Sequence, residues 1–149
     1  MEKLNFRLSE RGSVFVTVAI MIPILILLSG FIADIGRALA YRADLNKACM
    51  VAAEEAAKCI DMQIAMSEGR TVLGEHFEEV LVAYFESNIQ QSRSLKLKTL
   101  DYEVIESMEN PKFIKVFSEA AISCYFLKLI GIDTISISSS ANGRVRKIK

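Results

Sequence analysis

Histidine and tryptophan are almost missing from this chain of 149 residues, which has one His, at position 76, and no Trp. A single histidine leaves no second imidazole for a His-based metal cluster, and a Ser-His-Asp triad would depend on this one residue. The sequence also lacks a phosphate-cradling glycine loop and a Cys-x-x-Cys pair. We therefore predict that the chain is not an enzyme, that it needs no cofactor or metal, and that it binds no small-molecule substrate.

An excess of charge is also missing, because 18 basic residues balance 18 acidic ones. A net charge of zero gives no long-range attraction to nucleic acid or to acidic partners, and we expect no nucleic-acid binding. Apolar residues, in contrast, make up 52% of the chain. The length leaves room for one small domain beside a membrane anchor.

Cysteine is scarce and odd in number, with Cys49, Cys59 and Cys124. Three cysteines do not form a closed disulfide framework. If Cys49 and Cys59 share a helix, their separation is about 15 Å, which is too far for a bridge. Two readings stay open: Cys124 pairs with Cys49 or Cys59, or the three are small buried apolar residues.

The longest uncharged run, Ser13–Ala33, is the dominant feature of the sequence. About 20 helical residues span a hydrocarbon core of about 30 Å, so we expect a transmembrane anchor in the lipid bilayer. Pro23 lies inside the run and predicts a kinked helix. We divide the chain into a tail (1–12), the anchor (13–33) and an extracytoplasmic domain (34–149). The Ala38-Leu39-Ala40 segment matches a signal-cleavage pattern, but the run is longer than a signal sequence and we expect no cut there.

Charge does not settle the orientation, since three basic residues lie on each side of the run. We adopt a cytoplasmic tail as the default.

Beyond the anchor, apolar residues recur every three or four positions, which is typical of a helix continuing out of the membrane. Together with the anchor it predicts a rod of about 50 residues, or about 75 Å, ended by residues 67–71. The small side chains of this stripe would let a partner helix or the chain's own sheet approach closely. The stripe consists of Leu45, Ala48, Cys49, Ala52, Ala56, Ile60 and Ile64.

The rest of the sequence predicts an α+β fold. A second amphipathic helix is expected over residues 72–91, with Thr71 as its N-cap. From Leu95 the apolar residues alternate, with a change of phase near Thr99 that indicates a β-bulge. A turn at Asn110-Pro111, a strand-rich segment over 112–125, a short helical turn over 127–131 and a strand from Thr134 toward Val145 follow. We expect about three antiparallel strands with the helices on one face.

The N-terminal half resembles a known family. The Arg11–Pro23 segment (Arg-Gly-Ser-Val-Phe-Val-Thr-Val-Ala-Ile-Met-Ile-Pro), the Asp34-Ile35-Gly36-Arg37-Ala38 segment and the Leu45-Asn46-Lys47-Ala48 segment with its Ala-rich continuation look like the N-terminal region of TadE/TadG-like proteins. These proteins belong to the tight-adherence (Flp) pilus systems of bacteria. The match covers about residues 11–60.

The resemblance implies a minor pilin-like or pilus-assembly protein of the cytoplasmic membrane, whose partners are other pilus-assembly or pilin-like membrane proteins. In the TadE branch a prepilin peptidase cuts after a glycine, and a glutamate five residues on helps subunits to pack. Carried onto this chain, the cut falls between Gly12 and Ser13, and the glutamate position is Thr17. Thr17 is not a carboxylate, so we expect the TadG-like branch and an uncut anchor. The alternative is a signal-anchored extracytoplasmic binding domain unrelated to pili.

Overall fold

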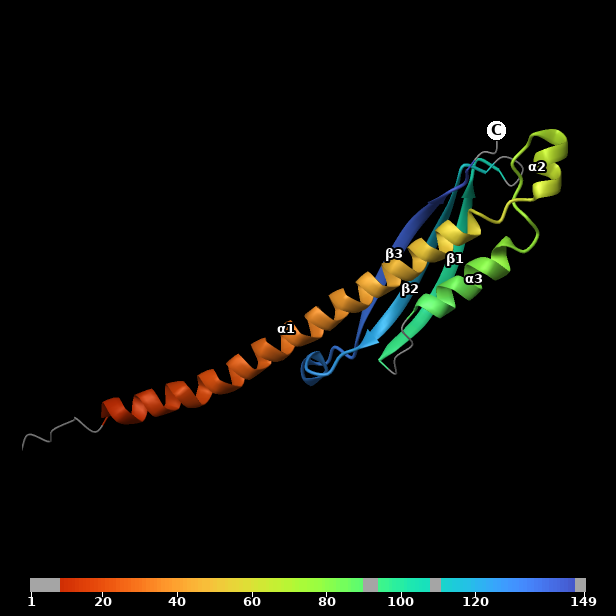
Figure 1. Cartoon of the computed structure of the whole chain (residues 1–149). Coiled ribbons are helices and arrows are strands. Elements are labelled where there is room, and N and C mark those ends of the chain that lie inside the picture. Colours follow the sequence, from red (N-terminus) through yellow and green to blue (C-terminus); the bar gives the residue numbers. More distant parts are fainter. Residues whose placement is uncertain (1–8, 90–93, 108–110, 147–149) are drawn as a thin grey trace, which may run out of the picture.

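A helix of 48 residues, α1 (Ser9–Ala56), sets the shape of the molecule (Figure 1). The structure is a computed structural model that describes residues 9–89, 94–107 and 111–146. At about 1.5 Å per residue, α1 is about 72 Å long. Its N-terminal half extends beyond the rest of the chain, and its C-terminal half lies against a sheet (Figure 1). Most of the 1–12 tail and the residue Asn110 of the expected turn lie outside the described residues.

The sheet is an antiparallel meander of three strands in the order β1-β2-β3, which confirms the predicted antiparallel arrangement. The strands are β1 (Leu95–Ile105), β2 (Phe113–Ser123) and β3 (Thr134–Arg144), and a short 3-10 helix, η1 (Leu127–Ile130), connects the last two. The pairing of β1 with β2 shifts register between Leu97 and Thr99, which confirms the predicted bulge. The bulge places Lys98 where its ammonium group contacts Glu119 of β2 and Ser136 of β3.

The core lies between one face of the sheet and two helices, α1 and α3 (Phe77–Asn88). Along β2 every second side chain is buried, beginning with Ile114, while the side chains between them are half-buried on the opposite face. Helix α3 contributes Phe77, Leu81 and Phe85 to the same core. The α+β class with its helices on one face is therefore confirmed.

The long helix ends at Ala56, so its predicted continuation through Ile60 and Ile64 is wrong. After Ala56 the hydrogen bonds tighten to the i−3 pattern, and Ile60 forms a β-bridge with Leu73. Asp61 then starts a new helix, α2 (Met62–Glu68), because its carboxylate accepts the N–H groups of Gln63 and Ile64. The Asp61 cap thus starts a separate helix, although the apolar period continues through this segment.

The second long helix also begins later than predicted, at Phe77 instead of residue 72. The bridge at Leu73 keeps this segment extended, and the N–H of Gly74 bonds to the carbonyl of Cys59. Thr71 is therefore not the N-cap; it is buried in the connection. His76 occupies the N-cap position, is exposed, and lies 3.3 Å from Glu79.

Candidate functional site at the junction of helix and domain

The residue that joins the two halves of the molecule is Asp34, on α1 directly after the apolar run. Its side chain is buried, with the whole residue 3% exposed. The carboxylate accepts backbone N–H groups from three consecutive residues: Tyr125 at 3.1 Å, Phe126 at 2.8 Å and Leu127 at 2.9 Å. Hydrogen bonds to an ionised acceptor are about twice as strong as neutral ones. Asp34 therefore ties the connection between β2 and β3 to the helix.

Arg37 completes the charge at this junction, one helical turn after Asp34. Its guanidinium lies 3.7 Å from the Asp34 carboxylate. Its central carbon also lies 4.1 Å from the centroid of the Tyr125 ring, a cation–π contact. The Arg side chain thus offsets the buried carboxylate and holds the aromatic ring next to the helix.

A glycine on α1 creates the third contact of the junction. The Phe126 ring packs directly on Gly30, where a Cβ atom would come within 2.4 Å of the ring. Around it lies a groove of about 420 Å³ lined by Phe126 and by the helix residues Ile22, Leu25, Ile26, Ser29, Gly30 and Ala33. Phe126 is thereby packed against the apolar part of α1, on the N-terminal side of Asp34.

The helix residues that contact the domain recur every four positions as Gly30, Asp34 and Ala38, all of them buried. They extend the predicted small-residue stripe toward the N-terminus. Sequence reasoning missed this part because a charged residue interrupts the apolar pattern. The small-x3-Asp-x3-small spacing was the available signal.

The predicted stripe itself packs against the chain's own sheet and α3. Its five residues on α1 are completely buried: Leu45, Ala48, Cys49, Ala52 and Ala56. The approach is closest at Gly143 of β3, where a Cβ would lie 1.9 Å from the carbonyl oxygen of Ala53. Of the two partners that the sequence left open, the chain's own sheet therefore occupies the stripe.

The three cysteines are free thiols, so neither disulfide that the sequence left open is formed. Cys49 and Cys124 are buried and Cys59 is half-buried. The Cys49 sulfur lies 3.1 Å from the Ser118 hydroxyl, which is itself buried on β2. Burial raises the pKa of the Cys124 and Cys59 thiols, which keeps both in the neutral form.

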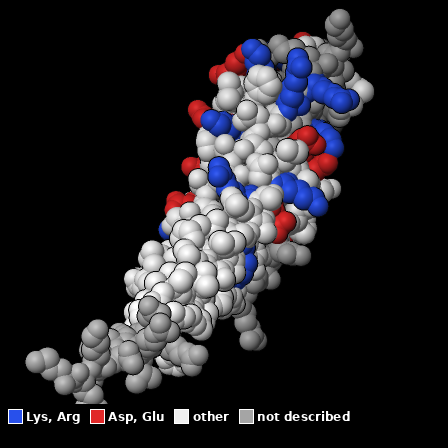
Figure 2. Space-filling model, turned by 90° about the vertical axis from the view of Figure 1, so that its left-hand side faces the viewer, with Lys and Arg blue, Asp and Glu red and all other residues white. Residues whose placement is uncertain are grey.

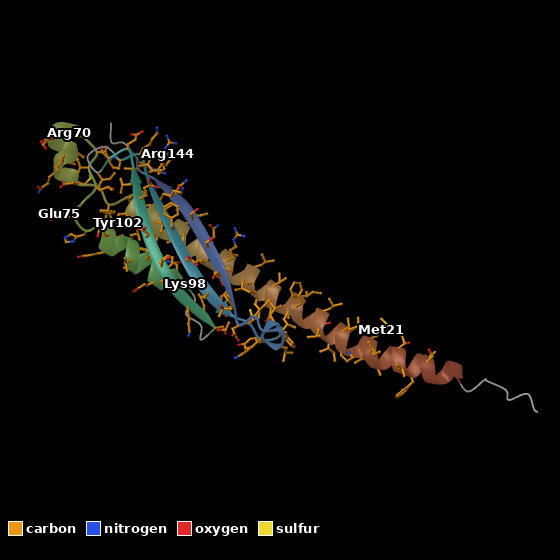
Figure 3. All side chains as sticks on the ribbon, turned by 180° about the vertical axis from the view of Figure 1, so that it is seen from behind. Met21, Arg70, Glu75, Lys98, Tyr102 and Arg144 are labelled. Carbon is orange, nitrogen blue, oxygen red and sulfur yellow. The ribbon has the colours of Figure 1, made fainter. Side chains whose placement is uncertain are left out.

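The N-terminal half of α1 is long and apolar enough to span a membrane. Its side chains are exposed, and Met21 in Figure 3 lies beyond the end of the sheet. Thr17 and Ser29 donate to the carbonyls of residues four earlier, each at 2.9 Å, so both polar groups are satisfied within the helix. The helix runs through Pro23, and in Figure 1 it curves gently without a sharp kink.

A scan against family models and searches of curated proteins and of solved structures found no match.

The domain carries a second hollow, of about 720 Å³, beside α1. Arg42 and Asn46 line it from the helix, and Glu119, Ser138 and Ser140 from the strands. Among the described residues, no three His, Cys, Asp or Glu side chains gather in an arrangement that could hold a metal ion. The hollow offers hydroxyl, amide and guanidinium groups for hydrogen bonding.

Proposed function

We propose that this chain is a membrane-anchored, minor pilin-like component of a tight-adherence (Flp) pilus or a related secretion system, closest to the TadG-like branch. The observation that supports the proposal is the division of α1. One continuous helix has an exposed apolar half and a half buried in an α+β domain, and the segment that resembles the family covers both.

The exposed half of α1 needs an apolar environment. The most apolar window of 18 residues in the helix has a mean hydropathy of 2.7, and only 6% of it is buried within the molecule. On the face in Figure 2, the Lys, Arg, Asp and Glu side chains gather over the domain, and the described surface toward the N-terminal end of α1 is white. A lipid bilayer covers such a segment along its whole length, since the 21 residues from Ser13 to Ala33 rise about 30 Å, the thickness of the hydrocarbon core.

The C-terminal half of α1 limits which surfaces remain for contacts with other proteins. The small-residue stripe is used by the chain's own sheet, so it offers no free surface for a partner helix. Contacts with other pilin-like proteins then fall to the exposed half, within the membrane, and to the polar surface of the domain. The continuous helix and the Asp34 junction hold the domain at a defined position next to the membrane.

The same proposal includes an uncut N-terminus. The bond between Gly12 and Ser13 lies within α1, and the Thr17 hydroxyl bonds back to the Ser13 carbonyl. Thr17 therefore needs no partner in the membrane, whereas a buried glutamate there would need one. We expect mass spectrometry of the protein isolated from its host to find the bond between Gly12 and Ser13 uncut. A mature chain that begins at Ser13 would instead assign it to the processed, filament-forming branch.

Deletion of the gene tests the pilus role. We expect piliation, counted by electron microscopy, to be lost or strongly reduced, and to return when the gene is supplied from a plasmid. A matched variant, Thr17→Val, keeps the shape of the side chain and should restore piliation equally, because Thr17 bonds only within its own helix. Normal piliation in the deletion strain would refute the proposal.

The polar hollow beside α1 favours a second candidate function, a signal-anchored extracytoplasmic binding domain. The gene neighbourhood separates the two. A secretion ATPase, a platform membrane protein or a prepilin peptidase nearby supports the pilus role, and a neighbourhood without them supports the binding domain.

A further inference from the structure

The strongest unexplained feature of the surface is an apolar patch on the connection between β2 and β3, which we name the basal loop (Tyr125–Ile132). Five of its eight residues are large apolar or aromatic side chains exposed to between 40% and 74%: Tyr125, Phe126, Leu129, Ile130 and Ile132. Contiguous apolar surface of this kind marks a contact with a partner or a membrane. In Figure 1 the loop lies at the end of the sheet nearest to the exposed half of α1.

The depth of the loop follows from its contact with the helix. Phe126 packs on Gly30, which lies three residues, or about 4.5 Å of helix, before the last uncharged residue Ala33. If the Ser13–Ala33 run spans the hydrocarbon core, the Phe126 ring is inside it. The groove around the ring is formed by helix side chains that the bilayer also covers, beginning with Ile22.

The 3-10 helix η1 exposes further apolar side chains of the basal loop next to Phe126. Side chains three positions apart are eclipsed in a 3-10 helix, so Leu129 lies on the edge that Phe126 begins. Leu127 is buried in the domain, whereas Leu129 and Ile130 are 74% and 62% exposed. Of these three side chains, Leu127 therefore belongs to the core, while Leu129 and Ile130 lie on the outside of the domain.

The backbone of the loop is also prepared for an apolar environment, where unsatisfied N–H groups are costly. Asp34 accepts the N–H groups of Tyr125, Phe126 and Leu127. Within the loop, the N–H of Leu129 bonds to the Phe126 carbonyl, and those of Gly131 and Ile132 to carbonyls of η1. The Gly131 turn has φ +87°, a conformation that glycine adopts without strain.

Polar groups at the rim of the loop suit the lipid headgroups. Arg37 lies over the Tyr125 ring, and aromatic and basic side chains are enriched at the boundary between membrane and water. Lys128 is exposed on η1 beside the apolar side chains and is long enough to extend its ammonium group toward phosphates.

We propose that the basal loop inserts Phe126, Leu129 and Ile130 into the lipid leaflet on the side of the domain, as a second membrane contact beside the α1 anchor. The occupant is lipid because the patch is continuous with helix surface that lipid covers. The inference rests on the membrane-spanning part of the proposed function and not on the pilus role. It gives the domain two points of attachment, which would fix its tilt on the membrane.

The absence of tryptophan makes a direct test available, because any introduced Trp is the only one. Single-Trp variants of the full chain are reconstituted in liposomes that contain lipids brominated on their acyl chains. Leu129→Trp probes the loop. Met66→Trp is the matched control, since Met66 is 79% exposed on α2 at the other end of the domain, and Leu25→Trp reports on the span itself.

We expect brominated lipid to quench Leu129→Trp and Leu25→Trp several-fold more than Met66→Trp, and the emission of Leu129→Trp to be blue-shifted relative to Met66→Trp. Ile130→Trp repeats the test at a neighbouring position. Quenching of Leu25→Trp without quenching of either loop variant would overturn the inference and leave the span intact. A loop Trp shielded from both brominated lipid and aqueous acrylamide would show that protein covers the patch, which also overturns it. If Leu25→Trp is not quenched either, the span and the inference are both wrong.

Discussion

Replacing Asp34 with asparagine is expected to loosen the junction between α1 and the basal loop. Asparagine has nearly the same shape, so the change removes charge and one acceptor without opening a cavity. The Oδ2 oxygen of the carboxylate accepts the N–H groups of Phe126 at 2.8 Å and Leu127 at 2.9 Å, and the Tyr125 N–H is shared between Oδ1 at 3.1 Å and Oδ2 at 3.2 Å. An asparagine that keeps its oxygen there turns its amide donors toward the Tyr125 N–H and toward Arg37.

The magnitude follows from the three hydrogen bonds. A hydrogen bond to a charged group is worth about 1.5–3 kcal/mol and a neutral one about 0.5–1.5 kcal/mol, so each bond loses about 1 kcal/mol. Tyr125 lies at the exposed rim of the loop, where water compensates for its bond, so the Phe126 and Leu127 bonds account for most of the loss. The ion pair with Arg37 adds less than about 1 kcal/mol. The junction should therefore lose about 2 kcal/mol, or about 30-fold in its opening equilibrium.

Hydrogen exchange of the full chain in bilayer nanodiscs measures this opening at the amides involved. In Asp34→Asn the protection of the Phe126 and Leu127 amides should fall by about 30-fold, while the central residues of β2 keep theirs. Asp44→Asn is the matched control. It is the same substitution ten residues later on α1, and the Asp44 side chain has no hydrogen-bond partner among the described residues. Unchanged protection at Phe126 and Leu127 in Asp34→Asn would refute the role given to this carboxylate.

Two further predictions concern the domain. Gly143→Ala should lower the free energy of unfolding by about 1–3 kcal/mol, because the added methyl group would lie 1.9 Å from the Ala53 carbonyl oxygen. Denaturant titration measures this change. The control Ser140→Ala, on the exposed face of the same strand, should leave the midpoint of unfolding unchanged. The hydroxyl of Tyr102, which lies beside α3 in Figure 3, donates to the Glu78 carboxylate, and this bond raises its pKa to about 12. Glu78→Gln should return that pKa toward 10 in a spectrophotometric titration. Since the neutral phenol is the favoured form, the pair stabilises the fold below about pH 10, and this contribution is lost as the pH rises through about 12. A Tyr102 pKa near 10 in the unchanged protein would contradict the role of this pair.

Much of the fold was predictable because its signals are local. Alternation identified β1 and β3, β-rich apolar composition identified β2, and a change of phase near Thr99 located the bulge that lies between Leu97 and Thr99. A period of 3.6 identified the helix stripe that begins at Leu45. These patterns depend only on which face of an element is buried, which neighbouring residues reveal.

The errors in the predicted helix boundaries also have a local physical cause. Ile60 and Ile64 continue the apolar period, but the Asp61 cap and the bridge from Ile60 to Leu73 involve specific hydrogen bonds that periodicity does not report. A cap and a bridge together outweighed the weak propensity of a few residues to extend α1.

The sequence by itself determined that an uncharged run long enough to cross a bilayer precedes an α+β domain, since length, hydropathy and period are properties of the chain alone. Only the tertiary structure decided what the residues at their boundary do. Asp34 and Phe126 lie 92 positions apart, and no local pattern connects them. The folding of the sheet against α1 brings the basal loop to the end of the apolar run, where a carboxylate, an arginine and a glycine hold it.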